Sequence, residues 1–399
     1  MPYYIGDVIK DEKRLIARTP EKFRETGIEV RLNTLAEGAN TDKGAVRLSD
    51  GTSVPYDILV LGTGSSAFVP KIPGIELEGV FTLKTLNDAI RMKAFIRDKQ
   101  CRKAIIVGAG FIGMEMSEAL RTHGIETQVI DLVPRPAARW DPEFSNMIME
   151  ELNRQNVTFS GDTGMVAIEQ GKDYRLRLST SKGEMEADMI LIAIGIRPNV
   201  KLASDFGLQI GKTGAIQVDF SQRTSKEGIY AVGDCCEVYH RVSHRWVHIP
   251  LGDVANKQGR VAGRNIGGGS MIFPGVVGAQ SFKIFSLEAA ATGLDESEAT
   301  SSGYHPVSNI IWGNAIARSM PGEKRLGIKL VADRATGKLL GAQAVGTIGA
   351  VSRINTLSCA LWTGMGLDEI AYLDLAYSPP VGPAWDPIHI AAQELMRKL

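Results

Sequence analysis

The stretch from residue 103 to residue 131 constrains the fold of this chain more than any other. An apolar run, Lys103-Ala-Ile-Ile-Val107, leads into Gly108-Ala-Gly110-Phe-Ile-Gly113, and a helical pattern follows over residues 114–122. The next strand, Thr127-Gln-Val-Ile-Asp131, ends in an acid. Uninterrupted apolar runs are typical of strands buried on both faces of a parallel sheet. The stretch therefore predicts a βαβ unit with a glycine-rich turn before its helix.

The spacing of the three glycines predicts a dinucleotide site. The first glycine allows the tight turn, the second lets the backbone approach a pyrophosphate, and the third lets helix and strand pack closely. The helix N-terminus then faces the phosphate charge. A glycine-rich turn without a ligand is the alternative. We favour it less because strand, glycines, helix and terminal acid occur together.

Asp131, at the end of the second strand, predicts which dinucleotide is bound. It stands at the spacing where a carboxylate accepts hydrogen bonds from ribose hydroxyls. Such a carboxylate repels a 2′-phosphate, so NADH is favoured over NADPH. Arg135 and Arg139 follow closely and would soften that preference.

The composition indicates a globular α/β protein with two or three domains. At 399 residues the chain is too long for a single core, and its 43 glycines fall mainly at strand ends and turns. Lys plus Arg and Asp plus Glu both number 45, so no net charge directs the protein to nucleic acid or to an acidic membrane. The sequence has no apolar run long enough to span a bilayer and no leader, and its four cysteines are too few for a disulfide framework. We therefore expect a cytoplasmic protein.

The remaining pattern changes from βα-rich to antiparallel at about residue 271. Before that point we expect further strands at residues 29–32, 45–48, 58–61 and 189–194. We also expect helices at residues 21–26, 87–99 and 254–266. The strand at 58–61 is expected to be buried on both faces. After residue 271 we expect strands at 327–332 and 338–345, joined through Thr336-Gly337, and helices at 350–364 and 386–398.

Two further turns are weak signals of a ligand contact when taken alone. They become stronger signals when the order of all the motifs along the chain is considered. Leu61-Gly-Thr-Gly64 and Tyr230-Ala-Val-Gly-Asp234 each end a strand, and each taken singly is more often a plain turn. The order of motifs along the chain resembles that of the pyridine nucleotide-disulfide oxidoreductase family: Thr63-Gly64, Gly108 to Gly113, Gly195-Ile-Arg-Pro-Asn199 and Gly233-Asp234. Within that family, three segments resemble coenzyme A disulfide and persulfide reductases: Pro2-Tyr-Tyr-Ile-Gly6, Ala255-Asn-Lys-Gln-Gly-Arg260 and Ala376-Tyr-Ser-Pro-Pro-Val-Gly-Pro-Ala-Trp-Asp386.

The resemblance implies two interleaved Rossmann-like domains, one for FAD and one for NAD(H), and a C-terminal α+β dimerisation domain that makes a homodimer. The FAD-binding domain would comprise residues 1–84 and 206–270, the NAD(H)-binding domain residues 85–205, and the dimerisation domain residues 271–399.

The resemblance also implies the site residues. NADH would be held by Gly108, Gly110, Gly113, Asp131 and Gly195, with Ile112 and Glu115 near the nicotinamide. FAD would be held by Thr63, Gly64, Asp234, Leu251 and Ala255, with Lys84 a weaker candidate, and Tyr377 would reach the flavin site of a neighbouring subunit. Asn256 and Trp385 lie where relatives contact coenzyme A.

The sequence departs from the family at its start. Relatives open with a glycine fingerprint for the FAD pyrophosphate and carry a redox cysteine in Asn-Cys-Gly-Leu-Pro, where this sequence has Met1 in place of the leucine. We therefore expect an N-terminal truncation or a partly represented polypeptide, with an exposed edge and apolar face on the FAD sheet. No catalytic residue is assigned beyond Tyr377. Relatives often carry paired tyrosines where this sequence has Arg318-Ser-Met-Pro-Gly322. This difference weakens the assignment of any specific disulfide substrate.

Other reactive side chains have plainer interpretations. Adjacent Cys235 and Cys236 would bridge only with strained geometry and are expected to be buried thiols, and Cys101 and Cys359 to be packing residues. His240, His244 and His248 lie in a β-like segment, so no metal site is expected. No Gly-x-Ser-x-Gly elbow or His-Glu-x-x-His motif supports a hydrolase.

The sequence thus predicts an enzyme that passes hydride from NADH through FAD to a disulfide or persulfide. An NADH oxidase or peroxidase, which would reduce oxygen or peroxide, is the alternative among enzymes. A catalytically inert NAD-binding fragment or assembly subunit is the alternative from another class.

Overall fold

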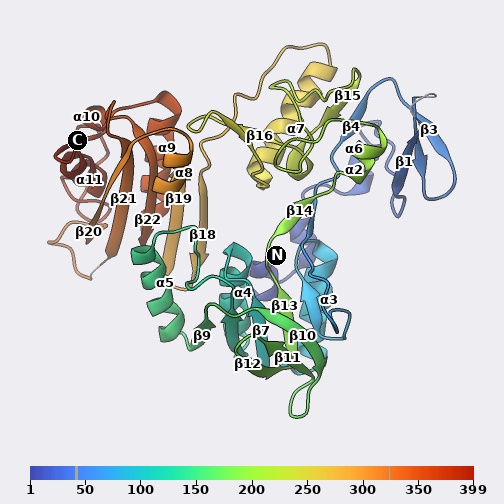
Figure 1. Ribbon diagram of the computed structural model, residues 1–399, viewed down its shortest axis with the longest axis horizontal. Helices are drawn as coiled ribbons and strands as arrows, with labels where there is room; N and C mark the ends of the chain where they lie inside the picture. Colours follow the sequence, from blue (N-terminus) through green and yellow to red (C-terminus); the bar gives the residue numbers. More distant parts are fainter. Residues whose placement is uncertain (41–43, 323) are drawn as a thin grey trace. The chain divides into compact units, whose positions relative to one another are not determined.

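The computed structural model describes residues 1–40, 44–322 and 324–399. The chain forms two compact units (Figure 1). Unit 1 comprises Met1–Glu12, Ala67–Gly195 and Val277–Leu399, and unit 2 comprises Lys13–Ser66 and Ile196–Val276. Within the described residues, no helix is both long and apolar enough to cross a membrane.

The first sheet of unit 1 is parallel and has the strand order β6-β13-β7-β8-β9. Its strands are β6 (Val80–Thr82), β7 (Lys103–Val107), β8 (Glu126–Ile130), β9 (Val157–Ser160) and β13 (Met189–Ile192). The central strand β7 is almost fully buried, which confirms the expected strand at 103–107. β6 belongs to this sheet although it precedes the expected domain boundary at residue 85.

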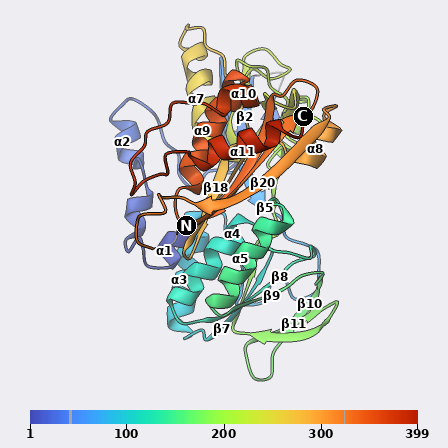
Figure 2. The same ribbon diagram turned by 90° about the vertical axis from the view of Figure 1, so that its left-hand side faces the viewer.

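The helices of this part begin at recognisable caps. They are α1 (Pro2–Ile5), α3 (Leu86–Asp98), α4 (Phe111–Thr122) and α5 (Pro142–Arg154). Thr85 and Asp88 form a reciprocal capping box at the start of α3. α1 packs on α3 and α4 (Figure 2). A three-stranded antiparallel sheet, β10 (Met165–Gln170), β11 (Leu176–Thr180) and β12 (Gly183–Ala187), completes this part of unit 1.

The second sheet of unit 1 is antiparallel and comes from the C-terminal third. Its order is β18-β19-β22-β21-β20. Its strands and helices are β18 (Gln280–Ile284), β19 (Leu287–Gly293), α8 (Glu296–Ser301), β20 (Pro306–Asn314), β21 (Arg325–Asp333), β22 (Leu339–Gly346), α9 (Ala350–Thr363), α10 (Leu367–Ile370) and α11 (Pro387–Met396). α9 packs on β19 and β22, and α11 packs on β20 and β21. The expected hairpin through Thr336-Gly337 and both C-terminal helices are confirmed.

An aromatic cluster joins the C-terminal sheet to the parallel-sheet part of unit 1. The rings of Phe111, Trp140 and Phe282 contact one another with centroids 5.1–5.6 Å apart. The indole Nε1 of Trp140 donates to the carbonyl oxygen of Ala290 at 3.2 Å. Because Phe111 is the first residue of α4, the start of that helix is fixed by side chains from a distant part of the sequence.

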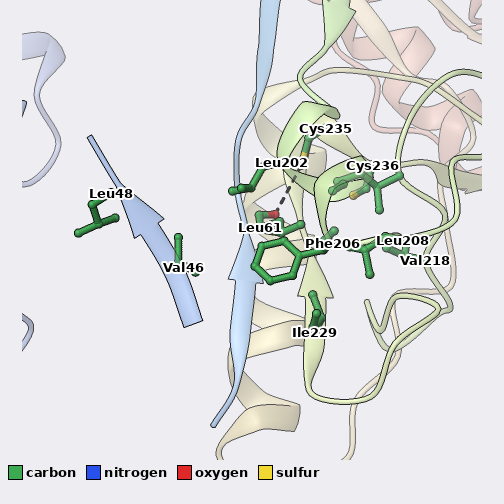
Figure 3. Close-up of a cluster of buried hydrophobic side chains, with 13 residues drawn as sticks. Val46, Leu48, Leu61, Leu202, Phe206, Leu208, Val218, Ile229, Cys235 and Cys236 are labelled. Carbon is green, nitrogen blue, oxygen red and sulfur yellow. Dashed lines mark hydrogen bonds between the residues drawn. The ribbon is translucent and has the colours of Figure 1, made fainter. Parts of the chain in front are cut away.

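Unit 2 consists of short strands around an apolar core. Its elements are α2 (Pro20–Arg24), β1 (Ala36–Asn40), β2 (Ala45–Leu48), β3 (Ser53–Pro55), β4 (Leu59–Leu61), β14 (Ile196–Pro198), α6 (Lys201–Asp205), β15 (Ile229–Ala231), η3 (Gly233–Cys235), β16 (Val238–His240), β17 (Arg245–Val247) and α7 (Gly252–Ile266). Two further elements, η1 (Glu12–Leu15) and β5 (Ser65–Ala67), each include residues of both units. β4 pairs in parallel with β15. Leu61, Phe206, Ile229 and neighbouring side chains form the core (Figure 3).

Two expectations for unit 2 are wrong. Residues 29–32 form no strand, and Leu32 is exposed. The strand at 58–61 is not buried on both faces, since Ile58 and Val60 are 43% and 44% exposed while Leu61 is 2% exposed. Among the described residues, β15 is the partner strand of β4, so one edge and part of one face of β4 remain open.

Candidate functional site

The turn between β7 and α4 requires its glycines. Gly108 has a φ of +109°, and a Cβ there would lie 2.3 Å from the carbonyl oxygen of Ala193. A Cβ on Gly113 would lie 2.0 Å from the carbonyl oxygen of Gly108. A Cβ on Gly110 would meet nothing within 4 Å. The first and third glycines therefore allow the backbone to pack, whereas the second leaves open space at the helix start.

The N-terminus of α4 is available to an anion. Gly110 is its N-cap, and no side chain of the described residues caps it. The first backbone N–H groups of a helix have no partner within the helix, and its dipole favours negative charge there. Ile112 and Glu115 lie on the first turns of this helix. The expected pyrophosphate position is therefore compatible with the residues present.

Asp131 is fixed at the end of β8 by backbone donors. The N–H of Ala109 donates to its Oδ2 at 2.7 Å, and the N–H of Val133 donates to its Oδ1 at 3.2 Å. A carboxylate has about four acceptor positions, so each oxygen retains one for a ribose hydroxyl. The ribose contact remains a prediction, and the structure adds a second role, which is to hold the glycine turn to the end of β8.

The two arginines after Asp131 differ in their surroundings. Arg139 lies 3.0 Å from Asp295 Oδ2 and 2.7 Å from Glu298 Oε2, at the start of α8. Its Nη2 also donates to the carbonyl oxygen of Gly293. The guanidinium of Arg139 is thus already bound by two carboxylates, and the expectation that it softens the preference for NADH stays a prediction. The Nε of Arg135 is buried and has no hydrogen-bond partner among the described residues.

Glu115 on α4 is paired with a tyrosine from α1. The hydroxyl of Tyr3 donates to Glu115 Oε1 at 3.2 Å. Burial raises the pKa of Glu115, and the hydrogen bond from Tyr3 opposes that rise. Burial and the neighbouring Glu115 raise the pKa of Tyr3 to about 12. Nothing in the sequence pattern identified Tyr3 as a neighbour of the expected nicotinamide position.

Gly195 follows β13 in unit 1. It has a φ of +117°, which favours glycine, and a Cβ there would meet nothing within 4 Å. Its carbonyl oxygen accepts a hydrogen bond from the N–H of Phe68 at 2.9 Å.

Within unit 2, Thr63 and Gly64 contact Asn199. The hydroxyl of Thr63 donates to the carbonyl oxygen of Asn199 at 2.6 Å, and Asn199 Nδ2 donates to the carbonyl oxygen of Thr63 at 2.9 Å. The N–H of Asn199 also donates to the carbonyl oxygen of Gly64. Asn199 thus holds the Thr63-Gly64 turn through its side chain and backbone, and no such role was predicted for it.

Three other expected FAD residues, Asp234, Leu251 and Ala255, lie at or beside the start of α7. Gly233 has a φ of +81°, and a Cβ there would lie 3.4 Å from the Cβ of Ala255. Asp234 Oδ2 accepts a hydrogen bond from the hydroxyl of Ser65 at 2.9 Å. Leu251 is the N-cap of α7, and within the described residues no side chain caps it. This second uncapped helix start, beside a carboxylate, is compatible with a flavin nucleotide.

Gln258 is a further residue that sequence reasoning missed. Its Oε1 accepts from the N–H of Gly233 at 2.9 Å, and its Nε2 donates to the carbonyl oxygen of Glu237. This nearly fully buried amide therefore fixes the Gly233-Asp234 turn against α7. Its position in the Ala255 to Arg260 motif was the available signal.

The remaining predicted site residues lie on separate elements. Lys84 precedes α3 in unit 1, and its N–H donates to Asp88. Tyr377 and Trp385 are exposed residues between α10 and α11. Asn256 lies on α7 in unit 2 and accepts a hydrogen bond from Arg260. Their roles toward FAD or coenzyme A stay predictions.

The cysteines are not a disulfide pair. Cys235 and Cys236 are free and buried in the core of unit 2 (Figure 3). Their contact lowers the pKa of Cys235 to about 6 and, with burial, raises that of Cys236. Cys101 is also free and buried. Cys359 is exposed on α9, so the expectation of a packing residue is wrong there.

The three histidines of the 240–248 segment have different partners. β16 and β17 form a hairpin, as expected from the β-like pattern. His240 Nδ1 accepts from the N–H of Ser243, His244 Nδ1 contacts the hydroxyl of Tyr239, and His248 Nε2 contacts the carbonyl oxygen of Asp234. In the part of the chain that the structure describes, no cluster of His, Cys, Asp or Glu could hold a metal ion.

Comparison with known proteins identifies the family. Residues 5–259 match the pyridine nucleotide-disulphide oxidoreductases. Residues 279–387 match the dimerisation domain of the same enzymes. The chain belongs to the pyridine nucleotide-disulphide oxidoreductase family.

Individual relatives of this oxidoreductase share most of its length. It is 36% identical to a CoA-dependent NAD(P)H sulfur oxidoreductase of Pyrococcus furiosus, over 99% of this chain and 89% of that protein. It is 32% identical to an NADH oxidase of Methanocaldococcus jannaschii, over 100% of this chain and 90% of that protein. A NAD-dependent persulfide reductase from A. fulgidus has a similar structure, with a TM-score of 0.95, 37% identity, and coverage of 100% of this chain and 75% of that chain.

These likenesses confirm several expectations. The family and the fold class are as predicted, and the chain is that of an FAD-dependent oxidoreductase that uses a pyridine nucleotide. The domain boundaries and the individual residue roles stay predictions.

Proposed function

We propose that this oxidoreductase passes hydride from NADH through FAD to a disulfide or persulfide substrate. The observation that carries the proposal is the start of α4, where Gly110 leaves open space at an uncapped helix N-terminus and Asp131 fixes the same turn. This arrangement binds a pyrophosphate and orients a ribose. The activities for which the P. furiosus and A. fulgidus relatives are named support the sulfur substrate.

The residues of each unit have distinct tasks in this proposal. In unit 1, the α4 N-terminus binds the NADH pyrophosphate, Asp131 orients the ribose, and Glu115 lies on the face near the nicotinamide. In unit 2, Asp234 accepts from ribityl hydroxyls, and the start of α7 binds the negatively charged part of FAD. FAD, when bound, accepts a hydride and supplies electrons to the substrate.

An NADH oxidase is the second candidate, and a specific observation favours it. The match to the M. jannaschii relative with that name covers 100% of this chain and 90% of the relative. The sequence similarity alone does not separate the two activities, because both are found on the same scaffold. We also propose that the protein acts in the cytoplasm as a homodimer, supported by the match to the dimerisation domain and by the free cysteines.

Flavin content and NADH oxidation test the proposal together. The purified chain is expected to be yellow, and anaerobic NADH should bleach its flavin absorbance. Subsequent addition of coenzyme A disulfide or persulfide should restore the colour and release thiol or sulfide. Restoration by oxygen but not by the sulfur substrates would favour the oxidase. A colourless protein that binds NADH would support the inert fragment instead.

A further inference from the structure

A cleft outside the predicted nucleotide sites lies where α1 packs on α3 and α4 (Figure 2). Its volume is about 790 Å³, and small-molecule sites typically have volumes of about 300–1,000 Å³. Every residue that lines it belongs to unit 1. Tyr4 lines the cleft, whereas the hydroxyl of Tyr3 donates to Glu115, beside the predicted nicotinamide position. The cleft and the predicted NADH site are therefore contacted by different residues of α1.

One wall of the cleft is apolar. It is formed by side chains on or just after α3 and α4, namely Ile90, Ala94, Ile96, Cys101 and Ile125. Of these, Ile96, Cys101 and Ile125 are at most 9% exposed. Burial raises the pKa of the Cys101 thiol to about 11, so this thiol is uncharged at neutral pH. The wall therefore favours a ligand with a hydrocarbon body.

Several polar groups of the cleft bind one another and fix its shape. Lys93 Nζ lies 2.6 Å from Asp7 Oδ1, donates to the carbonyl oxygen of Tyr4 at 2.8 Å, and lies 4.1 Å from the centre of the Tyr4 ring. His123 Nε2 contacts the carbonyl oxygen of Ile5 at 2.6 Å and lies 3.6 Å from Asp7 Oδ2. These contacts hold the end of α1 to α3 and α4, so this side of the cleft is formed before a ligand arrives.

Two cations of the cleft remain available to a ligand. In the part of the chain that the structure describes, the exposed Lys10 has no hydrogen bond and no ion pair. Arg97 binds Asp98 through Nε at 2.7 Å, and its two Nη atoms have no acceptor among the described residues. Three lysine or arginine side chains and two carboxylates line the cleft, so it carries one net positive charge when His123 is neutral. A ligand with a single negative charge is therefore favoured.

We propose that this cleft is a ligand site for an amphiphilic monocarboxylate, whose hydrocarbon chain lies against the apolar wall and whose carboxylate is bound by Lys10 and Arg97. A carboxylate matches the planar fork of a guanidinium, and the lysine ammonium adds a further charged donor. A doubly charged phosphate monoester is disfavoured, because the cleft has one net positive charge and also contains Asp7 and Glu12. The site is independent of the proposed hydride transfer from NADH.

Octanoate, 1-octanol and octylamine test this assignment, because they share the hydrocarbon chain and differ in the head group. Each would be titrated into the full chain by calorimetry at neutral pH. Octanoate is expected to bind with a dissociation constant of about 0.1–1 mM. It should bind at least about fivefold more tightly than the alcohol or the amine. Saturating NADH should leave the octanoate affinity within about twofold of its value without NADH.

Variants of the cleft locate the bound octanoate. Arg97→Gln and Lys10→Gln should each weaken octanoate binding roughly threefold to tenfold, since each removes one charged donor. Ala94→Trp, which places an indole in the cleft, should abolish measurable binding. The thermal midpoint of each variant shows whether it is folded.

Arg91→Gln is the matched control, because it removes the same charge from α3 at an exposed position outside the cleft. Its octanoate affinity should stay within about twofold of wild type. Equal losses in Arg91→Gln and Arg97→Gln would show a general charge effect and overturn the proposal. Equal affinities for octanoate and 1-octanol, or tighter binding of octylamine, would overturn the choice of a carboxylate. Competition between octanoate and NADH would place octanoate in the nucleotide site, and undetectable binding at millimolar octanoate would refute the site itself.

Discussion

The guanidinium of Arg353 and the carboxylate of Asp386 form a buried ion pair in the C-terminal part of unit 1. Arg353 Nη2 lies 2.7 Å from Asp386 Oδ2, and Nε lies 3.1 Å from both carboxylate oxygens. The side chains are 7% and 16% exposed. Asp386 Oδ1 also accepts from the N–H of Ile388 at the start of α11. The pair therefore fixes α9 to the end of the segment that carries Tyr377 and Trp385.

Replacement of Asp386 by Asn should destabilise the protein strongly. Asn can still cap α11, but it leaves the buried guanidinium of Arg353 without its counter-charge. Breaking a buried pair from one side costs about 3–5 kcal/mol. The free energy of unfolding in urea, monitored by tryptophan fluorescence, measures this loss.

An exposed pair on the same helix provides the control. Arg397 and Glu394 lie 2.5 Å apart, with side chains 72% and 46% exposed. Glu394→Gln should therefore cost less than about 1 kcal/mol. Equal losses in Asp386→Asn and Glu394→Gln would show that burial does not govern the strength of the first pair.

Gly110 and Gly108 should respond differently to alanine. Because a Cβ on Gly110 meets nothing within 4 Å, Gly110→Ala should fold with an unchanged thermal midpoint. The same methyl group would occupy the approach of the pyrophosphate, so NADH affinity should fall at least about tenfold, or about 1.4 kcal/mol. Gly108→Ala would combine a φ of +109° with a 2.3 Å contact, and should lower the stability itself by at least about 1 kcal/mol.

Calorimetric titration with NADH and thermal unfolding separate these two effects. A Gly110→Ala variant that binds NADH as tightly as wild type would contradict a pyrophosphate at this turn.

Asp131→Ala should weaken NADH binding and narrow the gap to NADPH. The alanine removes both a ribose acceptor and the carboxylate that repels a 2′-phosphate. It also frees the N–H groups of Ala109 and Val133, so some loss of stability should accompany it. Asp131→Asn retains an acceptor oxygen and should lose less NADH affinity than Asp131→Ala. Unchanged affinities for both nucleotides in Asp131→Ala would show that this acid does not contact the ribose.

The C-terminal third should hold two chains together. Residues 279–387 match a dimerisation domain, and large side chains such as Tyr372, Val381 and Trp385 are exposed there. Burial of such side chains between two copies is favourable. Light scattering at micromolar concentration should therefore give twice the mass of one chain. A monomeric mass under these conditions would contradict the homodimer.

The parts of the fold that could be predicted are those whose signal is local. The apolar run at 103–107 and the glycine spacing after it predict β7, the turn and α4 because each residue acts on its immediate neighbours. The pattern Glu29-Val-Arg-Leu alternates like a strand, yet no described strand pairs with it. Instead, Arg31 pairs with Glu29, and Leu32 stays exposed. A strand depends on its partner, which alternation alone does not provide.

The site shows the same limit. The predicted roles of Gly108, Gly110 and Asp131 follow from a contiguous motif. The partner of Arg139 is Asp295, which lies 156 residues further along the chain and became visible only in the folded structure. The same holds for Tyr3 and Glu115, which are 112 residues apart. Long-range pairs of this kind decide which charged groups remain available to a ligand.

The raised pKa of Glu115 should make the stability depend on pH in a defined direction. Burial keeps this carboxyl protonated in the folded protein at pH values where the unfolded chain has already released the proton. The folded state then binds more protons, so stability contributed by this group falls as pH rises from its ordinary value of 4.5 to the raised pKa. Glu115→Gln cannot titrate and escapes this loss. The thermal midpoint of Glu115→Gln relative to wild type should therefore increase with pH above 4.5 and then level off.

Tyr3→Phe gives a second, independent variant for this dependence. The Tyr3 hydroxyl lowers the pKa of Glu115 through its hydrogen bond, so its removal should raise that pKa further. The range over which stability falls should then extend to higher pH in Tyr3→Phe than in wild type. Thermal unfolding of the three proteins from pH 4.5 upward measures all of these shifts. A difference between Glu115→Gln and wild type that shrinks as pH rises would mean that Glu115 is stabilised as the carboxylate, and would refute the assignment.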